Sequence, residues 1–193
     1  VDSMLSNVEL RAASEDGTPV PDVPVRIRVG EGAGSLNGGK SEVTLRTDGK
    51  GAVDFDWTLP ETAGSCVAEA SIPSSEADKA SRTLSVTAQP EAPSQYKQEG
   101  HNQGAKGGQE LPNPLAVTLF DAYKNPVPGQ SVRFKVVTGG GTFGDGRQTA
   151  EVKTGDDGRA EVDFTVGGDP GLNAVEASVG TETVRFQAMT LGQ

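Results

Sequence analysis

The sequence contains very few of the residues that build reactive or metal-binding sites. Its 193 residues include one cysteine, Cys66, one histidine, His101, and one tryptophan, Trp57. A single cysteine excludes an internal disulfide and any metal site with several thiolates, and a single histidine excludes a metal site built from several histidines. Only a metal site made of acidic oxygen atoms stays open, so we expect no cofactor.

Positive charge and long apolar runs are also scarce. The chain has 17 Lys and Arg residues against 27 Asp and Glu residues, for a net charge of −10 at pH 7. This balance argues against a nucleic-acid partner, because phosphates require clustered basic side chains. No segment approaches the roughly 18–20 apolar residues of a membrane-spanning helix. Residues 1–6 lack the pattern of a signal peptide, which leaves the compartment open.

What the sequence has instead is alternation of apolar and charged residues with a period of two. This pattern is typical of strands with one buried face, and no segment has helical periodicity. The alternating segments are 25–29, 53–57, 132–136 and 162–166. Short strands separated by turn residues predict an all-β chain of antiparallel sandwiches. We expect cores formed by Val25, Ile27, Phe55 and Val86, and by Val132, Phe134, Phe164 and Phe186.

The two halves of the chain repeat each other. Pro-Val-Pro occurs at 19–21 and 126–128, a spacing of 107 residues, and Gly34–Leu36 and Thr47 match Gly141–Phe143 and Thr154 at the same spacing. Asp48-Gly49 and Asp157-Gly158 are spaced by 109, which predicts a loop two residues longer in the second copy and aligns Trp57 with Val166. The final strands match at a spacing of 100, which places seven extra residues of the first copy within 73–82.

This repeat predicts two domains, residues 1–90 and 91–193. Residues 89–114 are rich in Gly, Gln, Glu and Pro, a composition typical of a linker. Because everything from Leu115 onward already has a counterpart in the first copy, residues 91–113 should contain the first strand of the second domain. The first domain should then lack its opening strand, which suggests that the chain is a slice of a longer array.

Several motifs of the second half, taken together, resemble one known repeat. They are Gly-His-Asn-Gln-Gly at 100–104, Leu-Pro-Asn-Pro-Leu at 111–115, Asp-Ala-Tyr-Lys-Asn-Pro-Val-Pro-Gly at 121–129, the glycines at 139–141 and Pro-Gly-Leu-Asn-Ala-Val at 170–175. Over residues 95–188 this pattern is similar to the bacterial immunoglobulin-like group 1 repeat of invasin and intimin. Residues 8–88 resemble it more weakly and depart at Cys66, where the repeat has a residue like asparagine.

The resemblance implies immunoglobulin-like sandwiches of seven to nine strands, repeated in tandem in bacterial surface proteins. Most such repeats are rigid spacers that hold an adhesive tip away from the cell, and the family has no catalytic motif. We therefore expect a non-catalytic spacer or interaction module, extracellular or at the cell surface, whose partners are other domains of the same polypeptide. The alternatives are direct binding of a surface protein or glycan, with residues 73–82 as the contact, and an accessory module of a secreted enzyme.

The residues that could carry chemistry all have structural explanations. His101 has no neighbouring nucleophile pattern and reads as a loop residue, and Cys66 and Trp57 have the inward parity of core residues. Gly139–Gly141 does not continue as a phosphate-binding loop and predicts a sharp turn. The carboxylates that could form a site are Asp54, Asp56, Asp145, Asp156 and Asp157. They are too few for a calcium loop, so we expect them to lie in solvated turns or to point outward from strands. We therefore assign no catalytic, cofactor-binding or metal-binding residues.

Overall fold

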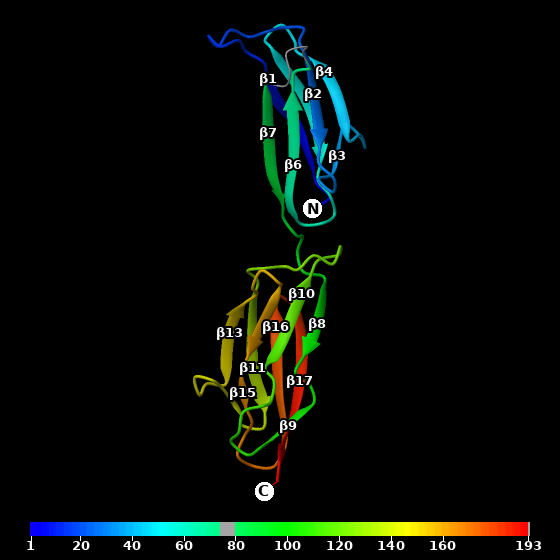
Figure 1. Cartoon of the computed structure of the whole chain (residues 1–193). Coiled ribbons are helices and arrows are strands. Elements are labelled where there is room, and N and C mark those ends of the chain that lie inside the picture. The colour runs from blue at the N-terminus through cyan, green and yellow to red at the C-terminus, as the bar shows by residue number, and fades with distance from the viewer. Residues whose placement is uncertain (74–79, 193) are drawn as a thin grey trace. The chain divides into compact units, whose positions relative to one another are not determined.

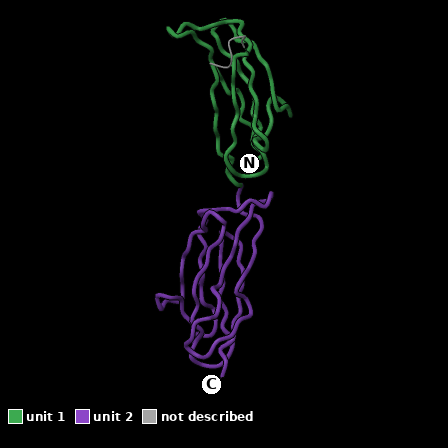
Figure 2. Tube along the Cα trace, viewed as in Figure 1, with its two compact units in different colours: residues 1–90 green, residues 91–193 purple. Residues whose placement is uncertain are grey.

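The computed structural model describes residues 1–73 and 80–192. In these residues every regular element is a strand. The described residues therefore include no helix that could cross a membrane. The chain divides into two compact units, unit 1 (Val1–Pro90) and unit 2 (Glu91–Gln193) (Figure 2). The prediction of an all-β chain is confirmed.

Unit 1 is a sandwich of two antiparallel sheets (Figure 1). Its three-stranded sheet has the order β1 (Met4–Arg11), β5 (Ala52–Thr58) and β3 (Ser35–Leu36). Its four-stranded sheet has the order β4 (Glu42–Arg46), β2 (Pro24–Val29), β6 (Gly64–Ser71) and β7 (Ser81–Ala88). The inward side chains of both sheets form one core, centred on Ile27, Leu36, Phe55 and Trp57.

Unit 2 repeats this arrangement and adds two strands. The counterparts of the strands of unit 1 are β10 (Leu115–Phe120), β11 (Ser131–Thr138), β12 (Thr142–Phe143), β13 (Thr149–Lys153), β14 (Arg159–Val162), β15 (Phe164–Thr165), β16 (Gly171–Val179) and β17 (Glu182–Leu191). The additional strands are β8 (Gln95–Glu99) and β9 (Gln103–Lys106). β8 pairs with β10 in antiparallel orientation, and β9 pairs with β17 in parallel orientation.

The apparent linker therefore contains two strands, β8 and β9, where the sequence predicted the first strand of the second domain. No strand among the described residues of unit 1 takes the place of either, as the repeat predicted. The segment 162–166 is interrupted at Asp163, because β14 pairs with β10 whereas β15 pairs with β12. Its alternation is kept: Val162, Phe164 and Val166 are buried, and Asp163 is exposed.

The repeated Pro-Val-Pro and threonine motifs make the same bonds in both units. Thr47 Oγ1 accepts a hydrogen bond from the amide of Val23 (2.9 Å) and donates one to the carbonyl of Val20 (2.8 Å). Thr154 does the same with Gln130 (2.9 Å) and Val127 (2.8 Å). Both threonines are buried, so each hydroxyl satisfies backbone groups that would otherwise lack a partner.

The alignment of the Asp-Gly pairs is wrong. Gly51 and Gly158, spaced by 107, have φ of +74° in each unit, whereas Gly49 is not in this region. The amide of Gly51 bonds to the carbonyl of Asp48, and that of Gly158 bonds to Gly155, so the two turns have equal length. The glycine that must adopt positive φ fixes the register, and the Asp-Gly pair does not.

Strand register also corrects the other two spacings. Leu36 pairs with Trp57, and Phe143 pairs with Phe164, so Trp57 is the counterpart of Phe164, not of Val166. In the last hairpin Ala70 pairs with Arg82, and its counterpart Ala177 pairs with Val184. The final strands are therefore spaced by 102 residues, and the first copy has five extra residues there, not seven. Of the segment 73–82, residues 74–79 lie outside the described residues.

Candidate functional site

The histidine and the carboxylates that the sequence singled out do not gather into a site. His101 is exposed between β8 and β9, and its Nδ1 accepts a hydrogen bond from the amide of Gln187 on β17 (3.2 Å). Asp145 and Asp157 each accept a bond from a backbone amide two residues ahead, while Asp54 and Asp56 lie on β5 in the other unit. Among the described residues there is no group of three or more potential metal ligands.

Trp57 and Cys66 are core residues. Trp57 is 2% exposed, and its indole nitrogen donates to the carbonyl of Ala33 (2.8 Å), so it is not available to stack on a sugar. Cys66 is 1% exposed. In unit 2 its position is Asn173, whose side chain accepts from the amide of Gly167 (3.0 Å) and donates to Thr190 Oγ1 (2.8 Å).

That polar pair is replaced as a whole in unit 1. Cys66 lies at the position of Asn173, and Ala88 at the position of Thr190, by the register of the last two strands. Both residues of unit 1 are buried. Exchanging a buried, hydrogen-bonded pair for two small apolar side chains leaves no polar atom without a partner. The thiol of Cys66 thus has a packing role.

The three glycines at 139–141 form the expected turn between β11 and β12. Gly139 has φ of +94°, and a Cβ there would lie 2.5 Å from Oδ1 of Asn173. At Gly141 a Cβ would meet the ring of Phe164. The glycines are needed because the chain passes directly over packed side chains, and the turn opens no helix.

The most buried carboxylate of unit 2 was not singled out from the sequence, although it lies in the motif at 121–129. Asp121 is 0% exposed and accepts four hydrogen bonds: from the amides of Glu91 (3.1 Å), Tyr123 (2.9 Å) and Asn125 (2.8 Å), and from the Asn125 side chain (2.9 Å). Burial acts to raise the pKa of Asp121, but these hydrogen bonds outweigh it, and the net pKa is lowered. Because its acceptors are used within the chain, Asp121 fixes the start of unit 2.

We expect Asp121→Asn to lower the stability of unit 2 at neutral pH and to flatten its loss in acid. A carboxyl group with a depressed pKa in the folded state stabilises above its unfolded pKa of about 3.9, and this contribution is lost as the pH falls through the folded pKa. Calorimetry checks this. Trp57 fluorescence identifies the unfolding transition of unit 1, so the other calorimetric transition belongs to unit 2. Asp163→Asn, at an exposed position, is the control, and an unchanged acid slope in Asp121→Asn would contradict the assignment.

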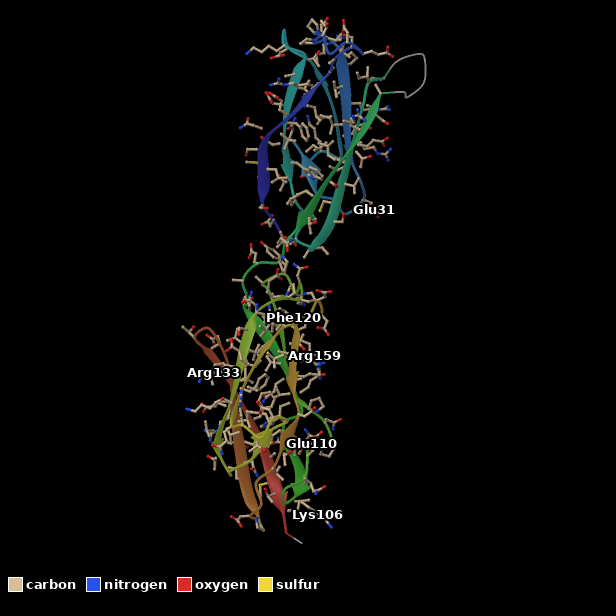
Figure 3. The ribbon with its side chains drawn as sticks, turned by 90° about the vertical axis from the view of Figure 1, so that its left-hand side faces the viewer. Glu31, Lys106, Glu110, Phe120, Arg133 and Arg159 are labelled. Atoms are coloured by element: carbon tan, nitrogen blue, oxygen red, sulfur yellow. The ribbon has the colours of Figure 1, made fainter. Side chains whose placement is uncertain are left out.

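Strands β13, β11, β16, β17 and β9 form, in this order, a five-stranded sheet in unit 2. The outer face of this sheet has a surplus of basic side chains, although the net charge of the chain is negative. Paired residues on β13, β11, β16 and β17 share this face, as shown by the neighbours Glu151–Arg133–Ser178 and Lys135–Glu176–Arg185. We call it the cationic face; its charged residues are Lys106, Arg133, Lys135, Lys153 and Arg185, with Glu151 and Glu176. Figure 3 shows Arg133 and Arg159 on opposite sides of unit 2.

The centre of this face is a shallow depression that recurs in unit 1. In unit 2 it has a volume of about 540 Å³ and is lined by Ser131, Arg133, Lys135, Glu176, Ser178 and Gly180. In unit 1 the volume is about 240 Å³, and the lining is Arg26, Arg28, Glu42, Glu69, Ser71 and Ser81. Four positions correspond at a spacing of 107: two bases, a glutamate and a serine. The sequence signal was the alternation in 25–29 and 132–136, where the bases are the outward residues.

Comparison with known proteins supports the fold. No family model matches the chain, and no curated protein is significantly similar to it in sequence. The structure of InvD from Yersinia pseudotuberculosis superimposes with a TM-score of 0.69 at 13% identity, covering 94% of this chain and 51% of that one. The Escherichia coli adhesin FdeC gives 0.68 at 18% identity, covering 95% of this chain and 58% of that one. The chain thus spans little more than half of either protein.

These likenesses bear on the architecture alone, because sequence identity is low. The chain has the immunoglobulin-like sandwich fold that the resemblance to invasin-type repeats predicted, and that prediction is confirmed. Function has to be argued from the residues of this chain.

Proposed function

We propose that the two units are consecutive, non-catalytic immunoglobulin-like domains of a bacterial surface or secreted protein and act as a stiff spacer between other domains of the same polypeptide. The fold shared with FdeC, an adhesin, supports a surface location. The observation that carries the spacer role is the shortness of the junction. β7 ends at Ala88, and the amide of Glu91 is already bonded to Asp121, which leaves Gln89 and Pro90 between the two.

A further contact shortens the free segment on the side of unit 2. The amide of Ser94 bonds to the carbonyl of Phe120 (2.9 Å). Pro90 has a fixed φ and Pro93 follows closely, which lowers the number of backbone conformations available to the junction. A junction of this kind favours limited motion between consecutive domains.

Spin-label distances test the spacer role. With Cys66→Ala as background, labels are placed at the exposed residues Glu42 and Lys153, one in each unit. We expect a narrow distance distribution, and a broad one when eight Gly and Ser residues are inserted between Pro90 and Glu91. If the uninserted chain gives a distribution as broad as the inserted one, the units move freely and the spacer role is contradicted.

The cationic face favours a second role, contact with an anionic surface polymer such as an acidic glycan. Five basic side chains and two acidic ones share one face of a chain whose net charge is −10, so the remaining surface is strongly acidic. The hydroxyl group of Ser178, next to Arg133, can donate a hydrogen bond to a sulfate or carboxylate group, whereas the hydroxyl group of Ser131 donates to Glu151.

We expect the chain to bind immobilised dextran sulfate at low salt and to be released as the ionic strength rises above about 0.1 M, where the screening length falls to about 10 Å. Arg133→Glu with Lys135→Glu should abolish retention. The matched control, Lys124→Glu with Arg147→Glu, changes the net charge equally at exposed loop positions and should leave retention intact. Equal losses in both variants would show an effect of net charge, not of the cationic face.

A further inference from the structure

One end of unit 2 has a small open pocket between its two sheets. It lies where β8 begins and where the hairpin of β16 and β17 turns, at the end of the unit farthest from the C-terminus (Figure 1). Its volume is about 410 Å³, and ligand pockets have volumes of about 300–1,000 Å³. We call it the Tyr96 pocket, and its main lining residues are Tyr96, Leu119, Gln130, Val179, Glu182 and Val184.

Tyr96 forms one wall of this pocket. It pairs with Leu119, which is 3% exposed, and directly paired residues share a face, so the Tyr96 side chain is on the interior side of β8. Gln98, two residues further on the same side, reaches across the gap between the sheets, where its Nε2 donates to the carbonyl of Arg185 (2.8 Å). Tyr96 itself is 52% exposed. An aromatic ring at the gap therefore has part of its surface available to a ligand.

The opposite wall is apolar at its base and polar at its rim. Val184 is 5% exposed, and the partly buried Val179 packs against the same core. Glu182 pairs with Val179 and is on the same side of β17 as Val184, but it is exposed. Gln130, directly before β11, completes the rim.

The polar side chains of the rim are not used within the described part of the chain. The backbone amide of Gln130 bonds to Thr154 Oγ1, but its side-chain amide has no partner in residues 1–73 and 80–192. The same holds in these residues for the hydroxyl of Tyr96 and the carboxylate of Glu182. One amide, one hydroxyl and one carboxylate at the pocket are thus available for hydrogen bonds to a ligand.

Unit 1 shows that the sandwich does not require these polar groups. Val23 has the position of Gln130, because the amides of both bond to the buried threonine of their unit. Ala80 has the position of Glu182, two residues before the residue paired with Ala70. The same fold therefore forms with small or apolar side chains at these positions, so the rim of unit 2 is explained better by binding than by folding.

The chemistry of the lining favours a neutral sugar. No described residue of the lining is basic, so an anion would lack a counter-charge, and Ser94 and Thr181 add hydroxyl groups. Amide and hydroxyl groups both donate and accept hydrogen bonds, as sugar hydroxyls do. A pyranose ring whose hydroxyl groups are all equatorial presents C–H bonds on both faces, and such an apolar face can pack on the ring of Tyr96.

We propose that the Tyr96 pocket binds a neutral saccharide with glucose-type pyranose rings. One ring packs on Tyr96, and its hydroxyl groups bond to the side chains of Gln130 and Glu182. The affinity is in the millimolar range, because a short saccharide buries little surface. The site goes beyond both the spacer role and the cationic face, whose bases point away from the interior of the sandwich.

The test is a titration of the full chain with cellotriose and with chitotriose, followed by the amide signals in two-dimensional NMR. We expect shifts in residues 93–96, 130 and 179–184. Tyr96→Ala should weaken binding about tenfold, whereas Tyr96→Phe, which keeps the ring, should change it less than about twofold. Gln130→Ala should weaken it about fivefold. Lys97→Ala, on the outward side of β8, is the matched control and should have no effect.

The salt dependence separates this site from the cationic face. Binding of a neutral saccharide should be the same at about 0.05 M and 0.5 M NaCl, because no charge pair has to form. Arg133→Glu with Lys135→Glu should leave it unchanged. A chain that fails to bind dextran sulfate but still binds cellotriose would therefore refute the role of the cationic face alone.

Three results would overturn the proposal. One is the absence of shifts at about 20 mM of either saccharide, well above a millimolar dissociation constant. Another is equal weakening by Tyr96→Ala and Lys97→Ala. The third is a set of shifts at the pocket with a decaproline peptide and none with the saccharides, since an aromatic pocket would then bind an extended proline-rich segment.

Discussion

Phe164→Ala is expected to destabilise unit 2 by about 3–5 kcal/mol, the range for removing a fully buried phenylalanine ring. The Phe164 side chain is 0% exposed and lies against Phe143, with ring centroids 5.6 Å apart. It also fills the space beside Gly141, where a Cβ would overlap the ring. The ring is enclosed by Phe143 and the glycine turn, so its removal leaves a cavity in the core, which favours the upper part of the range.

Calorimetry of the full chain measures this loss. The transition of unit 2 should move to lower temperature, while the transition reported by Trp57 in unit 1 stays in place. Arg133→Ala serves as the comparison, because Arg133 lies in the same unit but points outward. This substitution should change the free energy of unfolding of unit 2 by no more than about 0.5 kcal/mol. Equal, small effects of the two substitutions would mean that the inward and outward faces of the strands are assigned wrongly.

The fold could be predicted from the sequence because the alternation of apolar and charged residues identifies both the strands and their buried faces. In 25–29 and 132–136 each inward residue is buried and each outward residue is charged, so the period alone gives element and face. β8 could not be identified this way: Gln95–Glu99 has no buried residue, because the strand covers a sheet edge and does not contribute to the core. A strand in this region was predicted only because every segment from Leu115 onward already had a counterpart in the first copy.

The sequence alignment of the two copies was wrong where the same residue types adopt different backbone conformations. Asp-Gly at 48–49 looks like the turn at 157–158, but the backbone requires positive φ at Gly51 and Gly158, and nothing in the composition of the loop marks which glycine that is. The cationic face was visible as outward bases, yet its clustering depends on which strands are neighbours. Asp121 belonged to a motif, but its role depends on an amide thirty residues away in sequence, that of Glu91.

The glycine argument leads to the second large effect. Gly51→Ala should destabilise unit 1 by about 2–4 kcal/mol, since an L residue at this positive φ is strained and the added methyl group also overlaps backbone. Gly51 has φ of +74°, and a Cβ there would lie 2.6 Å from the carbonyl oxygen of Ala12 and 3.0 Å from the amide nitrogen of Val20. The Val20 amide donates a hydrogen bond to this Ala12 oxygen (3.0 Å), so neither atom can move without breaking the contact between the end of β1 and the Pro-Val-Pro segment.

Urea unfolding followed by Trp57 fluorescence measures this effect within unit 1. Gly49→Ala is the matched control in the same turn, because Gly49 lacks the positive φ and a Cβ there meets no atom within 4 Å. It should be neutral or slightly stabilising, since alanine lowers the conformational entropy of the unfolded chain. A loss at Gly49 as large as at Gly51 would restore the Asp-Gly pair as the element that fixes the turn, and with it the two-residue shift between the copies that strand register argues against.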